Sequence, residues 1–423
     1  MRTLKIACFL FASAIISVKA SDTKPPIFLE DQSVPRKYSC LNERYRDFGS
    51  IVSDHCRENS RPYWLLSLDG GGVRALMHLL SLERLENITG KPISDLVDGI
   101  SGTSSGGVLA CLLTMRDPKT LRPVYSAKFL LDMMLPTRDK MFVRRWSSLW
   151  GLLGPRYRSG PLERYLGGLL MDDKFKSRSL PVVLVAHDLN SYSEKLISTT
   201  DAPDFRTKDL AVAISAAPTY FEPKVLRSIS LPQVNHFLMD GATVMDNPVL
   251  AGVNLLQERH NVTLKNINVL SFGTGVDSTT HSSEGLIHSG FLGWGRKIVG
   301  ICREGQLSTT DSLARFYLKD RYHRFQPLLG EGNLHLVDTS DEYLHLLRRS
   351  HLKMLEDKNE EIIRIAGSLM DLAKVKKSRM PAIIRPSVPT LNPVAKRSFS
   401  TLSAGRYFSP QSFQLLRRFC FRR

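Results

Sequence analysis

A serine between glycines is the feature of this 423-residue chain whose residue types and spacing most suggest chemistry. Gly102-Thr103-Ser104-Ser105-Gly106 has the form G-x-S-x-G. The stretch from Ile93 to Ser101 can supply a buried strand before it, and Gly106 to Thr114 is apolar enough for a core helix after it. A nucleophile elbow needs this context, because small neighbours let a strained strand-to-helix turn expose the hydroxyl. By itself the motif is a weak signal.

Three consecutive glycines upstream, Gly70, Gly71 and Gly72, strengthen it. They follow Trp64 to Leu68, a predicted buried strand, and precede leucines at roughly helical spacing. Such a junction leaves backbone N–H groups uncovered at a helix N-terminus, which favours anions and developing oxyanions. A tight turn or a phosphate loop is the other interpretation, but the Rossmann spacing and the P-loop ending are absent. The sharper interpretation is an oxyanion hole for an ester attacked by Ser104.

At these residues the sequence resembles the patatin-like phospholipases. The family's D-G-G-G-x-R stands as Asp69 to Arg74, its G-x-S-x-G as Gly102 to Gly106, and its D-G-[AG] as Asp240-Gly241-Ala242. The stretches 215–221 and 270–275 also look like family sequence. The resemblance covers residues 61–373, and three motifs in the right order and separation make a strong signal.

The resemblance implies an α/β fold of three layers, α/β/α, with a central, mostly parallel sheet and a serine nucleophile elbow. It also implies a Ser104-Asp240 dyad, in which Asp240 takes the hydroxyl proton and an acyl-enzyme forms that water then clears. The amides of Gly70, Gly71 and Gly72 would hold the oxyanion, and Arg74 would help to position their loop. A carboxylate is a weaker base than imidazole, so oxyanion donors worth about 3 to 4 kcal/mol each become more important. No cofactor and no metal is implied, and no Cys/His cluster in the sequence suggests zinc.

Alternatives remain open for the chemistry. In an ordinary α/β-hydrolase, Asp240 would orient a later histidine such as His260, His281 or His288, although none of these lies in a recognisable motif. The same dyad would also suit a non-phospholipid acyl hydrolase or an acyltransferase. A non-catalytic lipid-binding protein could keep the fold. The pair His187-Asp188 follows a predicted strand, where such a pair is more often structural than catalytic.

Other elements are predicted from apolar patterns and from turn and cap residues. We expect a buried strand at 180–186, a helix of small residues at 211–217, a last core strand at 266–270 and a loop at 282–295. Thr339 and Glu342 have capping-box spacing and predict a helix to about Ala373.

The stretch from Phe129 to Leu153 mixes apolar and aromatic residues with Arg138, Lys140, Arg144 and Arg145. This composition suits a surface that touches a membrane or holds an acyl chain. It suits a segment that completes the core equally well, because its helical periodicity is imperfect. A flap here should be mobile.

The N-terminus predicts export. Residues 1–20 contain Arg2 and Lys5, an apolar run from Ile6 to Val18, and a small residue at Ala20, which is the layout of a cleaved signal peptide. An uncleaved anchor or a transit peptide is the alternative. We therefore expect a secreted or exported protein with a polar arm at 21–60 and a catalytic domain at 61–373. No later stretch is long and apolar enough to cross a bilayer.

Residues 374–423 form a basic tail. They contain twelve Lys and Arg and no Asp or Glu, and so carry most of the net charge of +17. Prolines and serines predict disorder there. The aromatic and basic end suits an anionic surface, and it suits a solvated tail without a partner equally well. Nucleic acid is not expected as a partner, because the charge is not on a folded face. The expected partner is a membrane lipid substrate, with peripheral membrane contact.

The cysteines suggest one bridge. Cys8 lies in the signal segment and leaves an odd number, so complete internal pairing is excluded. A Cys40–Cys56 bridge is reasonable for an exported protein, and Cys111, on the apolar helix after the elbow, is expected to be a buried thiol.

Overall fold

The computed structural model describes residues 61–145, 154–178, 180–201, 203–277, 290–330 and 334–379. The chain divides into two units, 1–55 and 56–423, and all the described residues belong to the second. The expected signal peptide, the polar arm, the Cys40–Cys56 bridge and nearly all of the basic tail lie outside the described residues.

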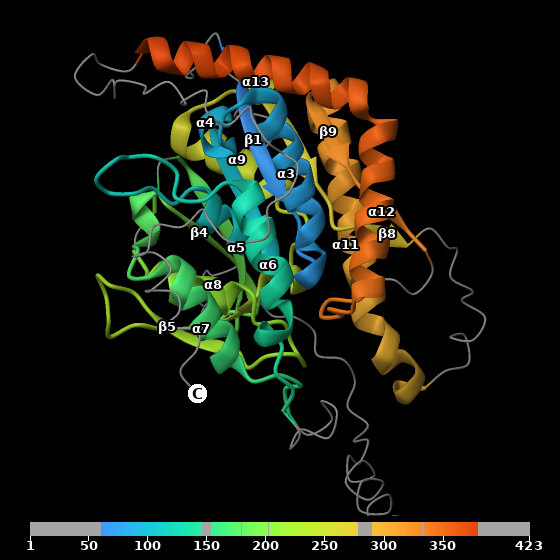
Figure 1. Ribbon diagram of the computed structural model, residues 1–423. Coiled ribbons are helices and arrows are strands. Elements are labelled where there is room, and N and C mark those ends of the chain that lie inside the picture. The colour runs from blue at the N-terminus through green and yellow to red at the C-terminus, as the bar shows by residue number, and fades with distance from the viewer. Residues whose placement is uncertain are drawn as a thin grey trace, which may run out of the picture. The chain divides into compact units, whose positions relative to one another are not determined.

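Within this part of the chain, eight strands form one mixed sheet in the order β5-β6-β3-β2-β1-β7-β9, and β4 also pairs with β3 (Figure 1). The neighbouring pairs among β3, β2, β1, β7 and β9 are parallel, while β4 and β6 pair antiparallel with β3, and β5 with β6. The expected fold class, α/β with a mostly parallel central sheet, is therefore confirmed. The strands are β1 Tyr63–Leu68, β2 Gly99–Thr103, β3 Val182–Asp188, β4 Ser193–Ser198, β5 Lys224–Arg227, β6 Asn235–Asp240, β7 Ile267–Phe272 and β9 Tyr322–Phe325, with β8 Val276–Asp277 and β10 Leu328–Leu329 paired separately.

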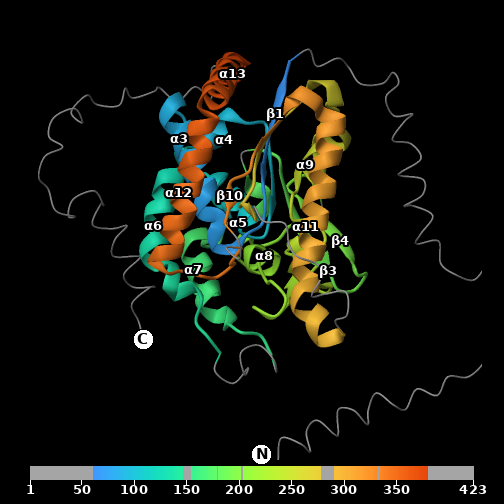
Figure 2. The same cartoon turned by 90° about the vertical axis from the view of Figure 1, so that its right-hand side faces the viewer.

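Helices cover both faces of the sheet, because alternate side chains of a strand point to opposite faces. Leu66 and Leu68 of β1 belong to the core shared with α3, α5 to α8, α12 and α13, whereas Leu65 packs against α9 and α11. Figure 2 shows α3, α6 and α12 on one side of the strands and α9 and α11 on the other. The helices are α3 Leu76–Thr89, α4 Ile93–Leu96, α5 Ser105–Leu113, α6 Ala127–Met141, α7 Ser159–Leu170, α8 Thr207–Ile214, α9 Val249–His260, α11 Phe291–Leu318, α12 Asp341–Asp357 and α13 Asn359–Arg379.

The strand before the serine is shorter than predicted. Ile93–Leu96 is the short helix α4, and β2 begins only at Gly99. Pro92 is the extended N-cap residue of α4, and the Glu86 carboxylate accepts the Ile93 N–H at 3.0 Å. This carboxylate satisfies an amide that the start of a helix leaves open, so α4 is favoured over a longer strand.

Three further predictions need correction. The strand at 266–270 is β7, but β9 follows it in the same sheet, so it is not the last core strand. Phe291 to Gly295 begin α11, so the predicted loop does not extend that far. Ser340, one residue after Thr339, caps α12 by accepting the Tyr343 N–H, and Lys358 separates α12 from α13.

The amphipathic stretch after α5 is helical in its first part. Leu130, Leu131 and Met141 of α6 are buried in the core, while residues 146–153 lie outside the described residues. This part of the stretch therefore completes the core. Cys111 on α5 is a fully buried free thiol, as predicted. In the described ranges, no helix is both long enough and apolar enough to span a bilayer.

Candidate active site

Strand register brings Ser104 and Asp240 together, although they are far apart in sequence. One edge of β3 pairs with β4 over Val183 to Asp188. The other edge is shared: Val185 pairs with Thr103 of β2, and the next residue, Ala186, pairs with Asp240 of β6. β2 and β6 therefore lie end to end along β3. The residue after Thr103 must consequently lie beside Asp240.

The two side chains are joined by a short hydrogen bond. The Ser104 Oγ donates to Asp240 Oδ2 at 2.6 Å. Ser104 is 7% exposed and Asp240 is 3% exposed, so the pair is buried at the carboxyl end of the parallel strands. This is the arrangement of a hydroxyl and its general base, with no intervening imidazole.

The turn that presents Ser104 is strained and depends on glycine. Ser104 has φ of 52° and ψ of −126° between β2 and α5. A Cβ at Gly102 would lie 2.6 Å from the Gly107 Cα, and one at Gly106 would lie 2.3 Å from the Leu68 carbonyl oxygen. Both positions are therefore closed to larger residues. The strain and the close packing together match the predicted elbow.

The environment of Asp240 adjusts its basicity. Burial raises the pKa of Asp240 to about 7, although the hydrogen bonds from Ser104 and from the Ala242 amide act in the opposite direction. A carboxyl with this pKa is a stronger base than an ordinary aspartate, is about half ionised at pH 7 and is largely ionised above pH 8.

The glycine loop after β1 lies against the serine. A Cβ at Gly70 would be 3.2 Å from the Ser104 Cβ and 2.3 Å from Asp246 Oδ1. One amide differs from the prediction, because the Gly70 N–H donates to the Asp246 carbonyl at 3.1 Å and is engaged. The amides of Gly71 and Gly72 have no acceptor within the described part of the chain. These two amides are the ones that can receive an oxyanion.

Arg74 contacts the carbonyl of Gly71 in this loop. Its side chain is completely buried, and its Nε donates to the Gly71 carbonyl at 3.3 Å. Burial and the nearby Arg303 lower the pKa of Arg74 to about 10, so the guanidinium stays charged at pH 7. The Gly71 carbonyl thus accepts from both the side chain and the backbone amide of Arg74.

Two ion pairs that the sequence did not reveal lie at the start of the loop, one on Asp69 and one on Asp246, whose carbonyl accepts the Gly70 N–H. Arg324 of β9 donates to both oxygens of Asp69, from Nη1 at 2.8 Å and from Nη2 at 2.5 Å. Arg303 of α11 pairs through Nη2 with Asp246 Oδ2 at 2.6 Å. Neither arginine lies in a recognisable motif, and each reaches the loop through the fold alone. An apolar residue pattern gives no signal for such partners.

His78 also supports the start of the loop. Burial lowers the pKa of His78 to about 4, so the ring is neutral at pH 7. Its Nε2 therefore donates to the Asp69 carbonyl, at 2.9 Å.

Of the three histidines of the alternative triad, the structure describes His260. His260 is the last residue of α9, a helix of 12 residues that begins at Val249, so it lies about 17 Å along the helix from that end. His281 and His288 are outside the described residues. The His187 Nδ1 lies 2.8 Å from Thr243 Oγ1, and Asp188 pairs with Lys195 at 3.3 Å. Both members of the predicted structural pair thus have other partners.

A cavity of about 600 Å³ adjoins the glycine loop. Its wall includes Leu336 and Tyr220. The Leu336 carbonyl accepts the Val73 N–H. Tyr220 is four residues after Ala216, and the Ala216 carbonyl accepts the Asp240 N–H. Phe142, Tyr157 and Arg156 also line it. Asp139 and Asp338 lie in the same wall, and neither Ser104 nor Asp240 lines this cavity.

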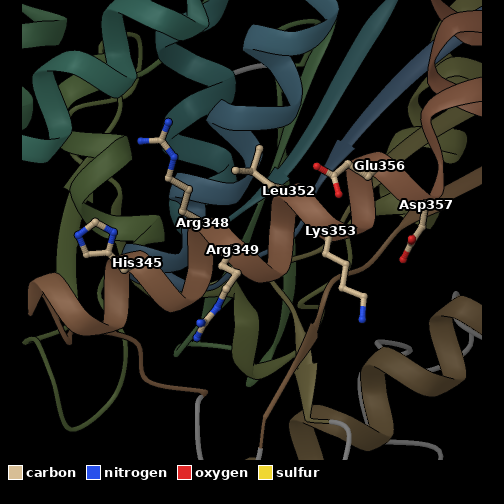
Figure 3. A pocket seen from close by; sticks show the side chains of 7 residues that line it. All are labelled: His345, Arg348, Arg349, Leu352, Lys353, Glu356 and Asp357. Atoms are coloured by element: carbon tan, nitrogen blue, oxygen red, sulfur yellow. The ribbon is translucent and has the colours of Figure 1, made fainter.

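A second hollow, of about 620 Å³, lies along the outer side of α12 (Figure 3). All of its lining residues belong to α12, among them Arg348, Arg349 and Lys353. None of the elements that carry Ser104, Asp240 or the glycine loop contributes to it, so it is not the candidate active site. Among the described residues, no group of His, Cys, Asp and Glu is placed to hold a metal ion.

Comparison with known proteins points to one family. Residues 66–253 match the family model described as Patatin-like phospholipase. Patatin-like protein 4 of Arabidopsis thaliana is 31% identical over 212 residues, which cover 46% of this chain and 52% of that protein. The chain thus spans about half the length of this relative.

Two further relatives differ in what their names say of activity. The cGAMP-activated phospholipase of Escherichia coli (strain TW11681) is 28% identical over 304 residues, covering 67% of this chain and 79% of that protein. The "Probable inactive patatin-like protein 9" of Arabidopsis thaliana is 29% identical over 253 residues, covering 55% and 65%. The family match includes the glycine loop, the elbow and Asp240, so residues 66–253 of the chain match the patatin-like phospholipase family.

Proposed function

We propose that this protein is a lipid acyl hydrolase of the phospholipase A type, which cleaves fatty-acyl esters of membrane glycerolipids with a Ser104-Asp240 dyad. The observation that carries the proposal is the 2.6 Å hydrogen bond from the Ser104 hydroxyl to the buried Asp240 carboxylate at a strained elbow. The family match supports a lipid ester as the substrate class.

The first half of the reaction forms an acyl-enzyme. Ser104 Oγ attacks the ester carbonyl carbon while its proton passes to Asp240 Oδ2. The negative charge that develops on the carbonyl oxygen is received by the amides of Gly71 and Gly72. When the tetrahedral intermediate collapses, the bond to the lipid alcohol breaks. Asp240 returns the proton to the departing oxygen.

The second half releases the fatty acid. Water attacks the acyl carbon and gives a proton to Asp240, and the bond to Ser104 Oγ then breaks and the hydroxyl recovers its proton. Asp240 must be ionised to start each half, so its pKa of about 7 suits operation at neutral or mildly alkaline pH.

The direct test is hydrolysis of a lipid panel. Purified protein is incubated with mixed-chain phospholipids, lysophospholipids, galactolipids and neutral glycerides, and the released fatty acid is identified by mass spectrometry. We expect release from at least one glycerolipid, and none above background with Ser104→Ala or Asp240→Asn. Release that is unchanged in Ser104→Ala would exclude Ser104 as the nucleophile.

The non-catalytic alternative has its own test, because one relative is named as probably inactive. A serine-reactive fluorophosphonate should label the folded protein at Ser104. A folded protein that the reagent does not label would favour the lipid-binding alternative over catalysis.

We also propose that the protein is exported through its N-terminal signal segment and contacts membranes peripherally. The charged start, apolar run and small residue of residues 1–20 support export. Expression of the full chain in a secreting host should give a product in the medium whose N-terminus begins at or near Ser21. Retention of Met1 in the cell fraction would contradict this.

A further inference from the structure

Two exposed apolar segments extend beyond the edge of the sheet at which Ser104 lies. The first is the docking hairpin, residues 224–237, made of β5, β6 and the turn between them. Leu238 of β6 pairs with Asp188, the last residue of β3, so the earlier residues of β6 continue past that strand. At about 3.4 Å per residue, Asn235 lies roughly 17 Å from Asp240 along β6. The turn therefore extends outward from the active-site edge.

The docking hairpin exposes apolar side chains. Val225 and Phe237 pair across its outer face, and Ile229, Leu231 and Val234 lie in the turn. Each of these five is at least 41% exposed. The segment contains no Asp or Glu, but Lys224 is paired with Glu163 of α7, whereas the exposed Arg227 donates to Asn235 within the hairpin. Its surface is therefore apolar, with the positive charge of Arg227.

The second segment is the helix tip, residues 291–302 of α11. Ala314 and Leu318, near the other end of α11, pack with Ile267 at the start of β7, whereas Arg303 reaches Asp246 beside the glycine loop. The helix thus runs antiparallel to the strands. Its first twelve residues extend about 18 Å beyond the level of Arg303 (Figures 1 and 2).

The helix tip has the same character as the docking hairpin. Its exposed apolar residues are Trp294, Ile298, Val299 and Ile301. Its sequence includes Arg296 and Lys297 and no acidic residue. Single exposed apolar residues are ordinary on protein surfaces, but here they gather on two projecting elements at one edge.

We propose that the docking hairpin and the helix tip bind the surface of a bilayer that contains anionic phospholipid and hold the Ser104 edge of the sheet against it. An anionic bilayer fits these segments in two ways. Basic residues without acidic neighbours in the same segment complement its negative charge, and the exposed apolar side chains can enter its interface beside the active site. The inference rests on the proposed function, because a lipid substrate makes a bilayer the surface that this edge must reach.

The test measures vesicle binding in a Ser104→Ala background, so that hydrolysis cannot alter the vesicles. Phosphatidylcholine vesicles with and without phosphatidylglycerol are floated with the full chain. Leu231→Ser/Val234→Ser removes apolar surface from the docking hairpin, and Trp294→Ser removes it from the helix tip. Phe316→Ser is the matched control, since Phe316 is 72% exposed at the opposite end of the same helix.

We expect the parent to bind anionic vesicles more tightly than uncharged ones. Each docking variant should bind the anionic vesicles about tenfold more weakly, and Phe316→Ser should bind them as the parent does. With Ser104 restored, all variants should hydrolyse the soluble ester p-nitrophenyl butyrate at the parental rate, which shows that they are folded.

Equal vesicle affinity of the parent and both docking variants would overturn the proposal, as would a parent that binds no vesicles or binds uncharged ones equally well. The outcome also separates the two proposals. If the docking variants lose vesicle binding but the wild type cleaves no ester, the docking surface stands and the hydrolase assignment fails. Ester cleavage with unaffected vesicle binding overturns the docking surface alone.

Discussion

Two buried aspartates at the same edge of the sheet, Asp240 and Asp69, have opposite roles in this account. Each precedes a glycine after a strand. Asp240 meets a neutral hydroxyl and a backbone amide, whereas both oxygens of Asp69 meet the guanidinium of Arg324. An uncharged partner leaves Asp240 free to exchange a proton, while a charged one fixes Asp69 as an anchor. Burial raises the pKa of both carboxyls, and the two differ in that the charge of Arg324 acts against this rise at Asp69.

The comparison predicts that the two sites fail in different ways. Changing Asp240 should remove activity and spare the fold, and changing the Asp69 pair should first weaken the fold.

Asp240→Asn should have the largest effect. Without a carboxylate to take the serine proton, kcat on p-nitrophenyl butyrate should fall about 100- to 10,000-fold, while the far-ultraviolet circular dichroism stays that of the wild type. A kcat within a few-fold of the wild type would show that Asp240 is not the base.

Arg324→Met should mainly cost stability. It leaves the Asp69 carboxylate buried and uncompensated, so the free energy of unfolding in urea should fall by about 3–5 kcal/mol. The double variant Asp69→Asn/Arg324→Met should recover part of this loss, because no buried charge remains at the site. A double variant less stable than Arg324→Met would contradict the assignment of the pair as an anchor.

Asp240 should itself lower stability at neutral pH. Its folded pKa of about 7 lies above the ordinary 3.8, so the folded protein binds more protons than the unfolded chain between these values. The contribution of protonated Asp240 to the free energy of unfolding is fully present below about pH 4 and is lost as the pH rises to about 7. From pH 4 to pH 8, the free energy of unfolding of Asp240→Asn should therefore rise relative to that of the wild type by up to about 4 kcal/mol, as measured by urea unfolding. A stability difference that does not change with pH would mean that burial does not shift this carboxyl.

Gly72→Ala should lower the free energy of unfolding by a smaller amount, and Gly90→Ala is its matched control. Gly72 has φ of 60°, and a Cβ there would lie 2.1 Å from the Leu336 carbonyl oxygen, whereas Gly90 has φ of 65° with open space around it. Gly90→Ala should cost about 1 kcal/mol from the backbone alone, and Gly72→Ala clearly more. Equal unfolding free energies for the two variants would show that contact with Leu336 is unimportant.

The sequence predicted the local parts of the site well. The strand and helix around Ser104 and the glycine turn follow from apolar runs and glycine signals, whereas β6, which ends at Asp240, was not predicted. The predicted features depend on neighbouring residues, so a linear pattern contains them. The extent of the strand before Ser104 was wrong, because Glu86, from the preceding helix, caps α4.

The sequence could not predict what tertiary pairing supplies. Arg324 lies on β9, a strand whose alternation of Tyr, His, Arg and Phe has little apolar signal, and it reaches Asp69 from 255 residues away. The engagement of the Gly70 amide likewise depends on the Asp246 carbonyl, which the fold places there. Motifs identify the reacting groups, and the fold alone identifies the groups that hold them.

The most direct test of the dyad is the rate at which a fluorophosphonate labels Ser104 as a function of pH, followed by intact-protein mass spectrometry. The reaction uses the same hydroxyl and base and needs no lipid interface. We predict that the wild-type rate rises with pH to a plateau with an apparent pKa of about 7, and that Asp240→Asn is labelled far more slowly at every pH. Labelling of Asp240→Asn at the wild-type rate, with the same pH profile, would contradict the account.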